Sequence, residues 1–139
     1  MIDDANALEL FRFADPVQSV TLQVACDAPM VSGDESYYAA EIAVESGFIS
    51  GAVGLHISDA DLDEWGQCLD ALESDEGVEW PPGGRSAWLS VVPEDPLEVT
   101  VHDSPSTQIA VQIPVDVPTG WLEENRLRLE HVRKATAKR

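Results

Sequence analysis

The hydrophobic pattern of this chain changes its period at a single residue, Ser58. Before that point, residues 38–44 alternate apolar and polar side chains, and residues 48–57 form a second segment of the same kind. Alternation with a period of two is typical of strands with one buried face, and the Ser46-Gly47 pair between the segments predicts a hairpin turn. After Ser58 the period becomes helical, so we expect a strand pair that leads directly into a helix.

The helix that follows is the best-defined element in the sequence. Ser58 and Asp61 have the spacing of a capping box, in which each side chain accepts a hydrogen bond from the other residue's backbone N–H. An apolar stripe at helical spacing comes next: Leu62, Trp65, Leu69 and Leu72. We expect Gly77 to end this segment, and Gly51 and Gly54 predict a bulge or a close backbone approach in the preceding strand.

Further apolar or alternating segments, each bounded by proline or glycine, predict the remaining strands. They lie at residues 8–13, 20–24, 78–80, 86–92, 97–102 and 108–115, with a loop over 27–36 and a last helix from Trp121 to about Ala135. This order predicts an α+β fold and a single domain over residues 1–139. We expect one antiparallel, strongly bent sheet, packed by the central amphipathic helix and closed at one edge by the C-terminal helix.

Charge is distributed unevenly along the chain. Residues 1–122 hold 23 acids and only two bases, Arg12 and Arg85, whereas residues 123–139 hold three acids and six bases. A body of this kind repels nucleic acid and anionic membranes and attracts basic proteins. Proteins of high-salt organisms are also acidic, but that explanation predicts an even spread of acid and fits the basic tail less well.

The densest acidic stretch runs from Asp59 to Glu79 and contains no base. We predict that most acids of this stretch contact a partner protein. They are Asp59, Asp63, Glu64, Asp70, Glu73, Asp75, Glu76 and Glu79. Like charges three or four residues apart destabilise a helix by about 0.2–0.5 kcal/mol per pair. A helix that accepts this cost without a balancing lysine favours a cationic partner outside the chain. A solvated outer face is the alternative explanation.

Motifs for catalysis or cofactor binding do not emerge from the sequence. His56, His102 and His131 fall on different expected elements, so nothing in the pattern brings them together. The acids after Ser58 begin like a calcium loop, but Glu64 stands where that loop needs glycine and Asp70 where it needs glutamate. We therefore expect no enzymatic activity, no metal and no cofactor.

The cysteines and the lengths of the apolar runs indicate the cellular compartment in which we expect the protein. Cys26 and Cys68 lack the spacing of a metal site, so we expect free thiols that serve packing. The acidic start of the chain has no apolar run behind it and is not expected to be a signal peptide. No apolar stretch is long enough for a transmembrane helix, and a cytoplasmic location is expected.

Several local motifs together resemble a known family. They are Ser46-Gly47-Phe48-Ile49-Ser50-Gly51, Ser58-x-x-Asp61-Leu62-x-x-Trp65, Leu69-x-x-Leu72, Trp80 and Gly120-Trp121-Leu122. In this order they resemble a family of small acidic actinobacterial proteins classed as a domain of unknown function, over nearly the whole chain. The glycine-containing strand and the capped helix are also distantly similar to WapI-type immunity proteins. That second resemblance implies a bacterial inhibitor that neutralises a toxin domain delivered by neighbouring cells.

Charge and resemblance together predict a non-enzymatic binding protein. We expect an immunity-type inhibitor whose acidic 59–79 face docks on a basic toxin domain, with a nuclease as the expected toxin. A nuclease needs a basic cleft for its phosphate substrate, and an acidic protein can block that cleft after electrostatically steered association. The alternative is a structural or regulatory adaptor that uses the basic last helix as its contact. The sequence leaves the partner's identity and the oligomeric state open.

Overall fold

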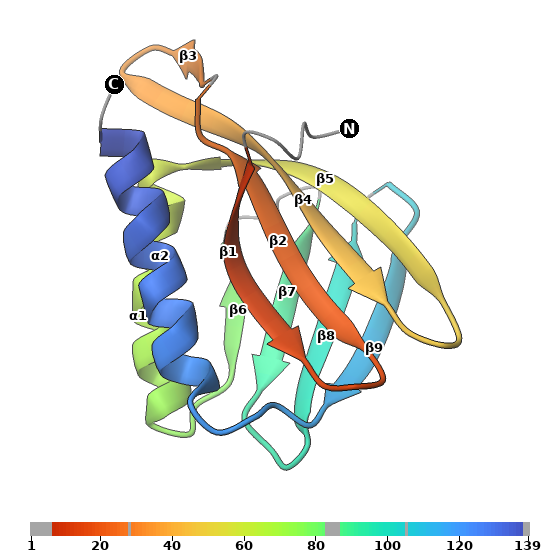
Figure 1. The fold of residues 1–139 in the computed structure, drawn as a ribbon. Coiled ribbons are helices and arrows are strands. Elements are labelled where there is room, and N and C mark those ends of the chain that lie inside the picture. The colour runs from red at the N-terminus through yellow and green to blue at the C-terminus, as the bar shows by residue number, and fades with distance from the viewer. Residues whose placement is uncertain (1–6, 28, 83–86, 105, 138–139) are drawn as a thin grey trace.

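The computed structural model describes residues 7–27, 29–82, 87–104 and 106–137, and two antiparallel sheets pack against each other across one core (Figure 1). The first sheet contains β1 (Ala7–Ala14), β2 (Ser19–Ala25), β3 (Met30–Ser32), β4 (Glu35–Glu45) and β5 (Ser50–Ser58). The second contains β6 (Val78–Trp80), β7 (Trp88–Val92), β8 (Leu97–Asp103) and β9 (Ile109–Val115). The helices are α1 (Asp59–Glu73) and α2 (Trp121–Ala137). They contact each other along one side of the sheet pair.

The predicted α+β class with antiparallel strands, a central amphipathic helix and a C-terminal helix is confirmed. The strands divide into two sheets, whereas the sequence suggested one bent sheet. The division arises because α1 separates β5 from β6, so the chain leaves the first sheet at Ser58 and starts the second at Val78. Strand order is β1-β2-β4 with β5 on the far side of β4 in the first sheet, and β6-β7-β8-β9 in the second.

The start of α1 forms as the sequence predicts. The backbone N–H of Ser58 donates to Asp61 Oδ2 at 2.9 Å, and the backbone N–H of Asp61 donates to Ser58 Oγ at 3.2 Å. Both side chains are buried, and so is the whole predicted stripe: Leu62, Trp65, Leu69 and Leu72. The capping box therefore fixes the point at which the β5 strand becomes a helix.

Two local predictions fail. Residues 27–36 are not wholly a loop, because β3 pairs with the start of β4 across a turn in which Gly33 has a φ of 65°. All three β3 residues are exposed, so this strand has no buried face that alternation could reveal. The glycines of β5 mark neither a bulge nor a close backbone approach, since the register with β4 is continuous, a Cβ on Gly51 would meet nothing within 4 Å, and one on Gly54 would meet only Ala40 O at an ordinary 3.8 Å.

The register shift occurs in β1 instead. It lies between Glu9 and Phe11, and it lets both Leu10 and Phe11 face the core. The predicted strand over 86–92 begins at Trp88 in the structure, and Ser86 lies outside the described residues. These differences change the edges of elements and leave their order intact.

An aromatic cluster joins both sheets to α1. Phe11 of β1 lies 5.1 Å from Trp65 of α1, and Trp65 lies 5.3 Å from Trp80 of β6, measured between ring centroids. The Trp80 indole N–H donates to the backbone carbonyl of Asp61 at 2.7 Å. Trp65 Nε1 is also buried but has no hydrogen-bond partner among the described residues. Trp65 and Trp80 are therefore core residues.

Each sheet has one edge strand covered by a helix. On α2, the fully buried Asn125 pairs with the edge of β1: its Oδ1 accepts from Arg12 N at 2.9 Å and its Nδ2 donates to Arg12 O at 3.3 Å. α1 packs against β6, the edge of the second sheet. The opposite edges, β5 and β9, lie on the side of the molecule away from both helices (Figure 1).

We predict that Trp80→Phe lowers the free energy of unfolding by about 1–2 kcal/mol more than Trp65→Phe. Both changes remove the same volume from the same cluster, but only the Trp80 indole gives up a hydrogen bond. Urea unfolding followed by far-UV circular dichroism measures the difference. Equal losses would show that the bond to Asp61 does not stabilise the fold.

Candidate functional site

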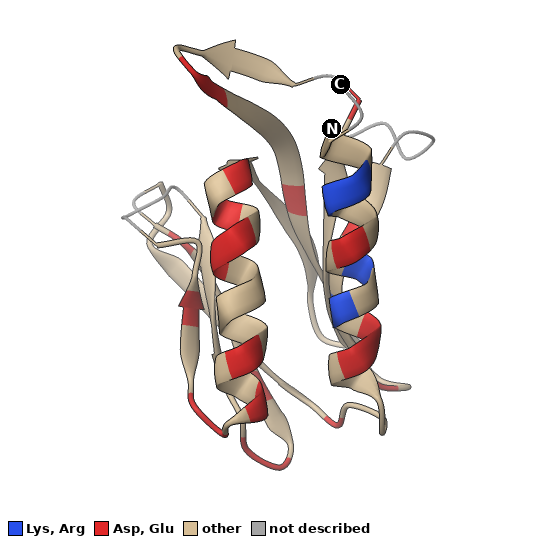
Figure 2. Cartoon of the chain, turned by 90° about the vertical axis from the view of Figure 1, so that its left-hand side faces the viewer, with Lys and Arg blue, Asp and Glu red and all other residues tan. Residues whose placement is uncertain are grey.

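Three of the predicted partner-binding acids have cationic partners inside the chain. Arg126 of α2 reaches back to α1, with Nη1 2.7 Å from Asp70 Oδ1 and Nη2 2.7 Å from Glu73 Oε1. Arg133 lies 3.4 Å from Asp63 Oδ1. Figure 2 shows acids along α1 and bases on the neighbouring α2. The basic tail therefore supplies part of the balancing charge that the 59–79 stretch lacks.

The other described bases of α2 are paired as well. Arg128 Nε lies 3.0 Å from Glu9 Oε1 on β1, and Lys134 lies 3.2 Å from Glu130 on the same helix. The hydrogen bond to Asp70 raises the pKa of Arg126 above its ordinary value. Lys138 and Arg139 lie outside the described residues. Arg126, Arg128 and Arg133 thus contact acids of the body, whereas Lys134 pairs within α2, and the adaptor alternative stays a prediction.

The remaining predicted acids are exposed and form no ion pair with a described Lys or Arg: Asp59, Glu64, Asp75, Glu76 and Glu79. Asp59 accepts a hydrogen bond from the Tyr38 hydroxyl at 3.2 Å. Asp75 and Glu76 lie in the turn between α1 and β6, and Glu79 lies on β6 itself. The acids without a described ionic partner therefore include all three that follow the C-terminal end of α1.

The register of the second sheet brings further acids to that end. Val78 pairs with Val91, Val92 pairs with Glu98, and Leu97 pairs with Val115. The α1–β6 turn, the β7–β8 loop and the β9–α2 link therefore meet at one end of the sheet, at the bottom of Figure 1. The acidic end is our name for the exposed acids of these segments: Asp75, Glu76, Glu94, Asp95 and Asp116. None of the five forms an ion pair with a described base.

Asp75 closes α1 where the sequence suggested Gly77. Glu76 N donates to Ala71 O at 2.9 Å and Asp75 N donates to Leu72 O at 3.1 Å, while Asp75 has a φ of 61°. This is the hydrogen-bond pattern of a Schellman motif, whose left-handed position is usually glycine. Aspartate enters the left-handed region more readily than most side chains, which is why the helix can end before the glycine.

An aspartate at this position disfavours folding in two ways. The left-handed conformation costs a non-glycine residue about 1 kcal/mol. The charge also lies at the negative end of the helix dipole, beside Glu76 and with no base in the last turn. The stability of the fold therefore does not explain why position 75 is an aspartate.

Asp15 fixes the neighbouring part of the acidic end. Its Oδ1 accepts from the backbone N–H groups of Val17 at 2.8 Å and Gln18 at 2.9 Å, and its Oδ2 accepts from Asp116 N at 2.9 Å. The bond from Asp116 is the main reason that the pKa of Asp15 lies below its ordinary value. One carboxylate thus ties the β1–β2 turn of the first sheet to the β9–α2 link of the second.

The histidines and cysteines, which could take part in catalysis or metal binding, lie outside the acidic end and in separate parts of the fold. His56 is on β5, His102 on β8 and His131 on α2. No disulfide joins Cys26 and Cys68, and burial, with a contribution from Glu64, raises the pKa of the Cys68 thiol to about 11. Within the described residues, no three potential ligands among His, Cys, Asp and Glu lie close enough to share a metal ion. The helices that the structure describes are too short or too polar to cross a membrane.

Comparison with known proteins identifies a family. A model of a family of unknown function (DUF5959) matches residues 8–137. The chain belongs to this family. Membership confirms the predicted resemblance to an uncharacterised domain, and the resemblance to immunity proteins stays a prediction.

Two other comparisons were with solved structures and with curated proteins. The plant transcriptional regulator PBF-2 has a similar structure, with a TM-score of 0.49 and 13% sequence identity over 94% of this chain and 80% of that one. No curated protein matches the chain.

We predict that Asp75→Asn raises the free energy of unfolding by about 0.5 kcal/mol, because it removes charge from the negative end of α1 and keeps a residue that tolerates a positive φ. Asp59→Asn is the matched control at the other end of the same helix and should lower stability. Urea unfolding at low ionic strength measures both. Changes of the same sign would contradict the dipole argument.

We predict that Asp15→Asn lowers the free energy of unfolding by about 1 kcal/mol near neutral pH, because the amide accepts the three backbone bonds less strongly. Since the folded pKa is lowered, the carboxylate's contribution is fully present above the unfolded value of 3.8 and is lost as pH falls through the folded pKa. The difference between wild type and variant should therefore shrink on acidification below that value. Urea unfolding across a pH series measures it, and a constant difference would rule out the ionised carboxylate as its cause.

Proposed function

We propose that the chain is a non-enzymatic binding protein whose acidic end docks on a basic partner protein. The observation that carries this proposal is Asp75, an exposed acid held in a left-handed conformation at the negative end of α1. Strained residues cluster at sites where a protein binds or acts, and an interaction outside the chain would explain this one. The formal net charge of -18 adds long-range attraction for a basic partner.

The surface differs from the one that the sequence suggested. Asp63, Asp70 and Glu73 lie against α2 and serve to hold the two helices together. The partner surface then consists of the acidic end together with Glu79 on β6. Rigid elements support it on both sides, because the α1 terminus and the second sheet meet there.

The partner that fits this surface best is a toxin domain with nuclease activity. Such a domain carries a basic cleft for a polyanionic backbone. Carboxylates spread over three adjoining turns can occupy the positions of several phosphates at once. Inhibition of a delivered toxin also needs fast capture, which complementary charge provides. The resemblance to immunity proteins that we predict from the sequence motifs is in line with this assignment.

Capture from a native lysate at low and raised salt, with mass spectrometry of the bound proteins, tests the proposal. One variant neutralises the acidic end: Asp75→Asn, Glu76→Gln and Glu94→Gln. Its control makes the same change in net charge around β3, at the far end of the molecule: Asp27→Asn, Asp34→Asn and Glu35→Gln. A basic protein should bind to wild type and to the control variant, be lost from the first variant, and elute at raised salt.

The captured protein then decides the finer assignment. Its nuclease activity, measured with and without an equimolar amount of the chain, should fall in the presence of wild type. Equal capture by the two variants would remove the acidic end from the interaction. If the chain binds the captured protein but leaves its activity unchanged, the proposed role as an inhibitor is contradicted. The more general proposal of a binding protein would still hold.

A further inference from the structure

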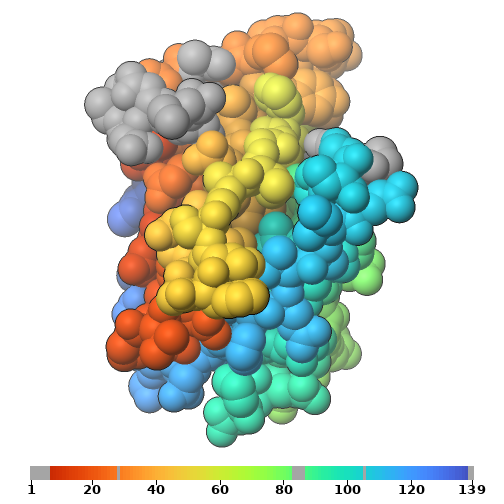
Figure 3. Space-filling model, turned by 90° about the vertical axis from the view of Figure 1, so that its right-hand side faces the viewer, coloured from red at the N-terminus to blue at the C-terminus, as the bar shows by residue number. Residues whose placement is uncertain are grey.

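We infer that the groove between β5 and β9 binds an extended segment of a partner protein, which adds a strand to the edge of β5. The inference is independent of the acidic end. β1 and β6 are covered by helices, whereas β5 pairs only with β4 and β9 only with β8 among the described strands. Figure 3 shows this side of the molecule, with β5 in yellow and β9 in blue beside each other.

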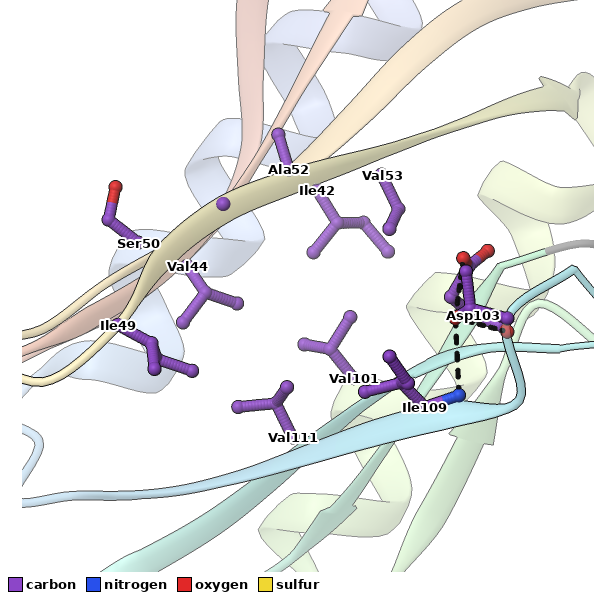
Figure 4. Close-up of a pocket in the computed structure, with 12 residues that line it drawn as sticks. Ile42, Val44, Ile49, Ser50, Ala52, Val53, Val101, Asp103, Ile109 and Val111 are labelled. Carbon is purple, nitrogen blue, oxygen red and sulfur yellow. Dashed lines mark hydrogen bonds between the residues drawn. The ribbon is translucent and has the colours of Figure 1, made fainter.

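An apolar cavity of about 360 Å³ opens between these two edges. Side chains from β4, β5 and the turn between them face side chains from β8 and β9 across it (Figure 4). Its aliphatic lining includes Val44, Ile49, Val53, Val101, Ile109 and Val111. Ile109 is 61% exposed, so the core leaves a large apolar residue in solvent here. A volume of this size is typical of sites that enclose apolar groups of a ligand.

The edge of β5 lacks the features that usually block strand addition. Its nine residues, Ser50–Ser58, include no Asp, Glu, Lys, Arg or Pro, and its register has no bulge. Protein edges are normally protected by charge, proline or a bulge. β9 carries Pro114, which removes a backbone donor from the other edge. A Cβ atom built on Gly51 would meet nothing within 4 Å, so small residues leave the β5 backbone accessible.

The charge near the groove indicates which kind of partner segment binds there. Asp103 lines the groove, and its carboxylate accepts a hydrogen bond from the Thr107 hydroxyl at 3.0 Å but forms no ion pair with a described base. The occupant is therefore a strand whose alternate residues are aliphatic and face the groove, with one basic residue at the groove-facing position nearest Asp103. A second copy of this chain fits worse, because two bodies of charge -18 repel each other.

Selection of peptides from a random twelve-residue library on the immobilised chain tests this inference. The enriched peptides should have aliphatic residues at alternate positions and a Lys or Arg at one position of the same face. A synthetic copy of one such peptide, titrated calorimetrically, should bind about tenfold more weakly when alternate backbone nitrogens are N-methylated. This control keeps every side chain and uses the wild-type protein, so it does not depend on a variant folding.

A pair of exposed substitutions locates the peptide. Ile109→Lys should weaken binding at least about tenfold, whereas Val31→Lys, which places the same charge on β3 at a residue 71% exposed, should not. The variant with a neutralised acidic end should keep its affinity for the peptide, which separates this inference from the proposed function.

Three results would overturn the inference. They are the absence of an enriched peptide, equal affinity for the N-methylated peptide, and equal affinity of the Ile109→Lys protein. Sedimentation equilibrium tests the other occupant. A concentration-dependent dimer that disappears in Ile109→Lys would assign the groove to a second copy of the chain and overturn binding of a partner strand.

Discussion

The packing of Trp65 between Phe11 and Trp80 is the contact on which the rest of the structure depends. It brings α1 against one strand from each sheet, and the bond from Trp80 to the carbonyl of Asp61 fixes the first turn of the helix in that position. Because α1 then lies along one side of the sheet pair, α2 can pack beside it and cover the edge of β1. The opposite side receives no helix from the described part of the chain, so the exposed β5 and β9 edges follow from where the aromatic residues are placed.

Electrostatics completes the same arrangement. The acids of α1 that face α2 would repel one another, and Arg126 compensates Asp70 and Glu73 at hydrogen-bond distance while Arg133 forms a longer ion pair with Asp63. Exposed ion pairs of this kind contribute modestly to stability, about 0–1 kcal/mol each. Those pairs leave exposed acids without a described ionic partner at several places on the surface, among them the turns beyond the end of α1.

The sequence predicts most elements because their signals are local. The Ser58 and Asp61 caps, the apolar stripe of α1 and the alternating strands all depend on neighbours a few residues away. The division into two sheets, the exposed β3 and the bulge after Glu9 depend on pairing partners, which periodicity does not reveal. The candidate site shows the same limit: Asp75, Glu76 and Glu79 stand in one acidic run, whereas Glu94, Asp95 and Asp116 join them only through strand register. The pairing of Arg126 with Asp70 and Glu73 likewise joins residues more than fifty positions apart.

The two surfaces proposed for this chain act on different parts of a binding reaction. Charge on the acidic end acts at long range, so it raises the association rate and loses its effect in salt. Strand addition at β5 acts only at contact and excludes water from the apolar groove, so it slows dissociation and is far less sensitive to salt. The acidic end lies at the end of the second sheet, while the groove lies on the side away from the helices. A partner that used both would need a folded basic domain for the first and an extended segment for the second, and neither surface by itself requires the other.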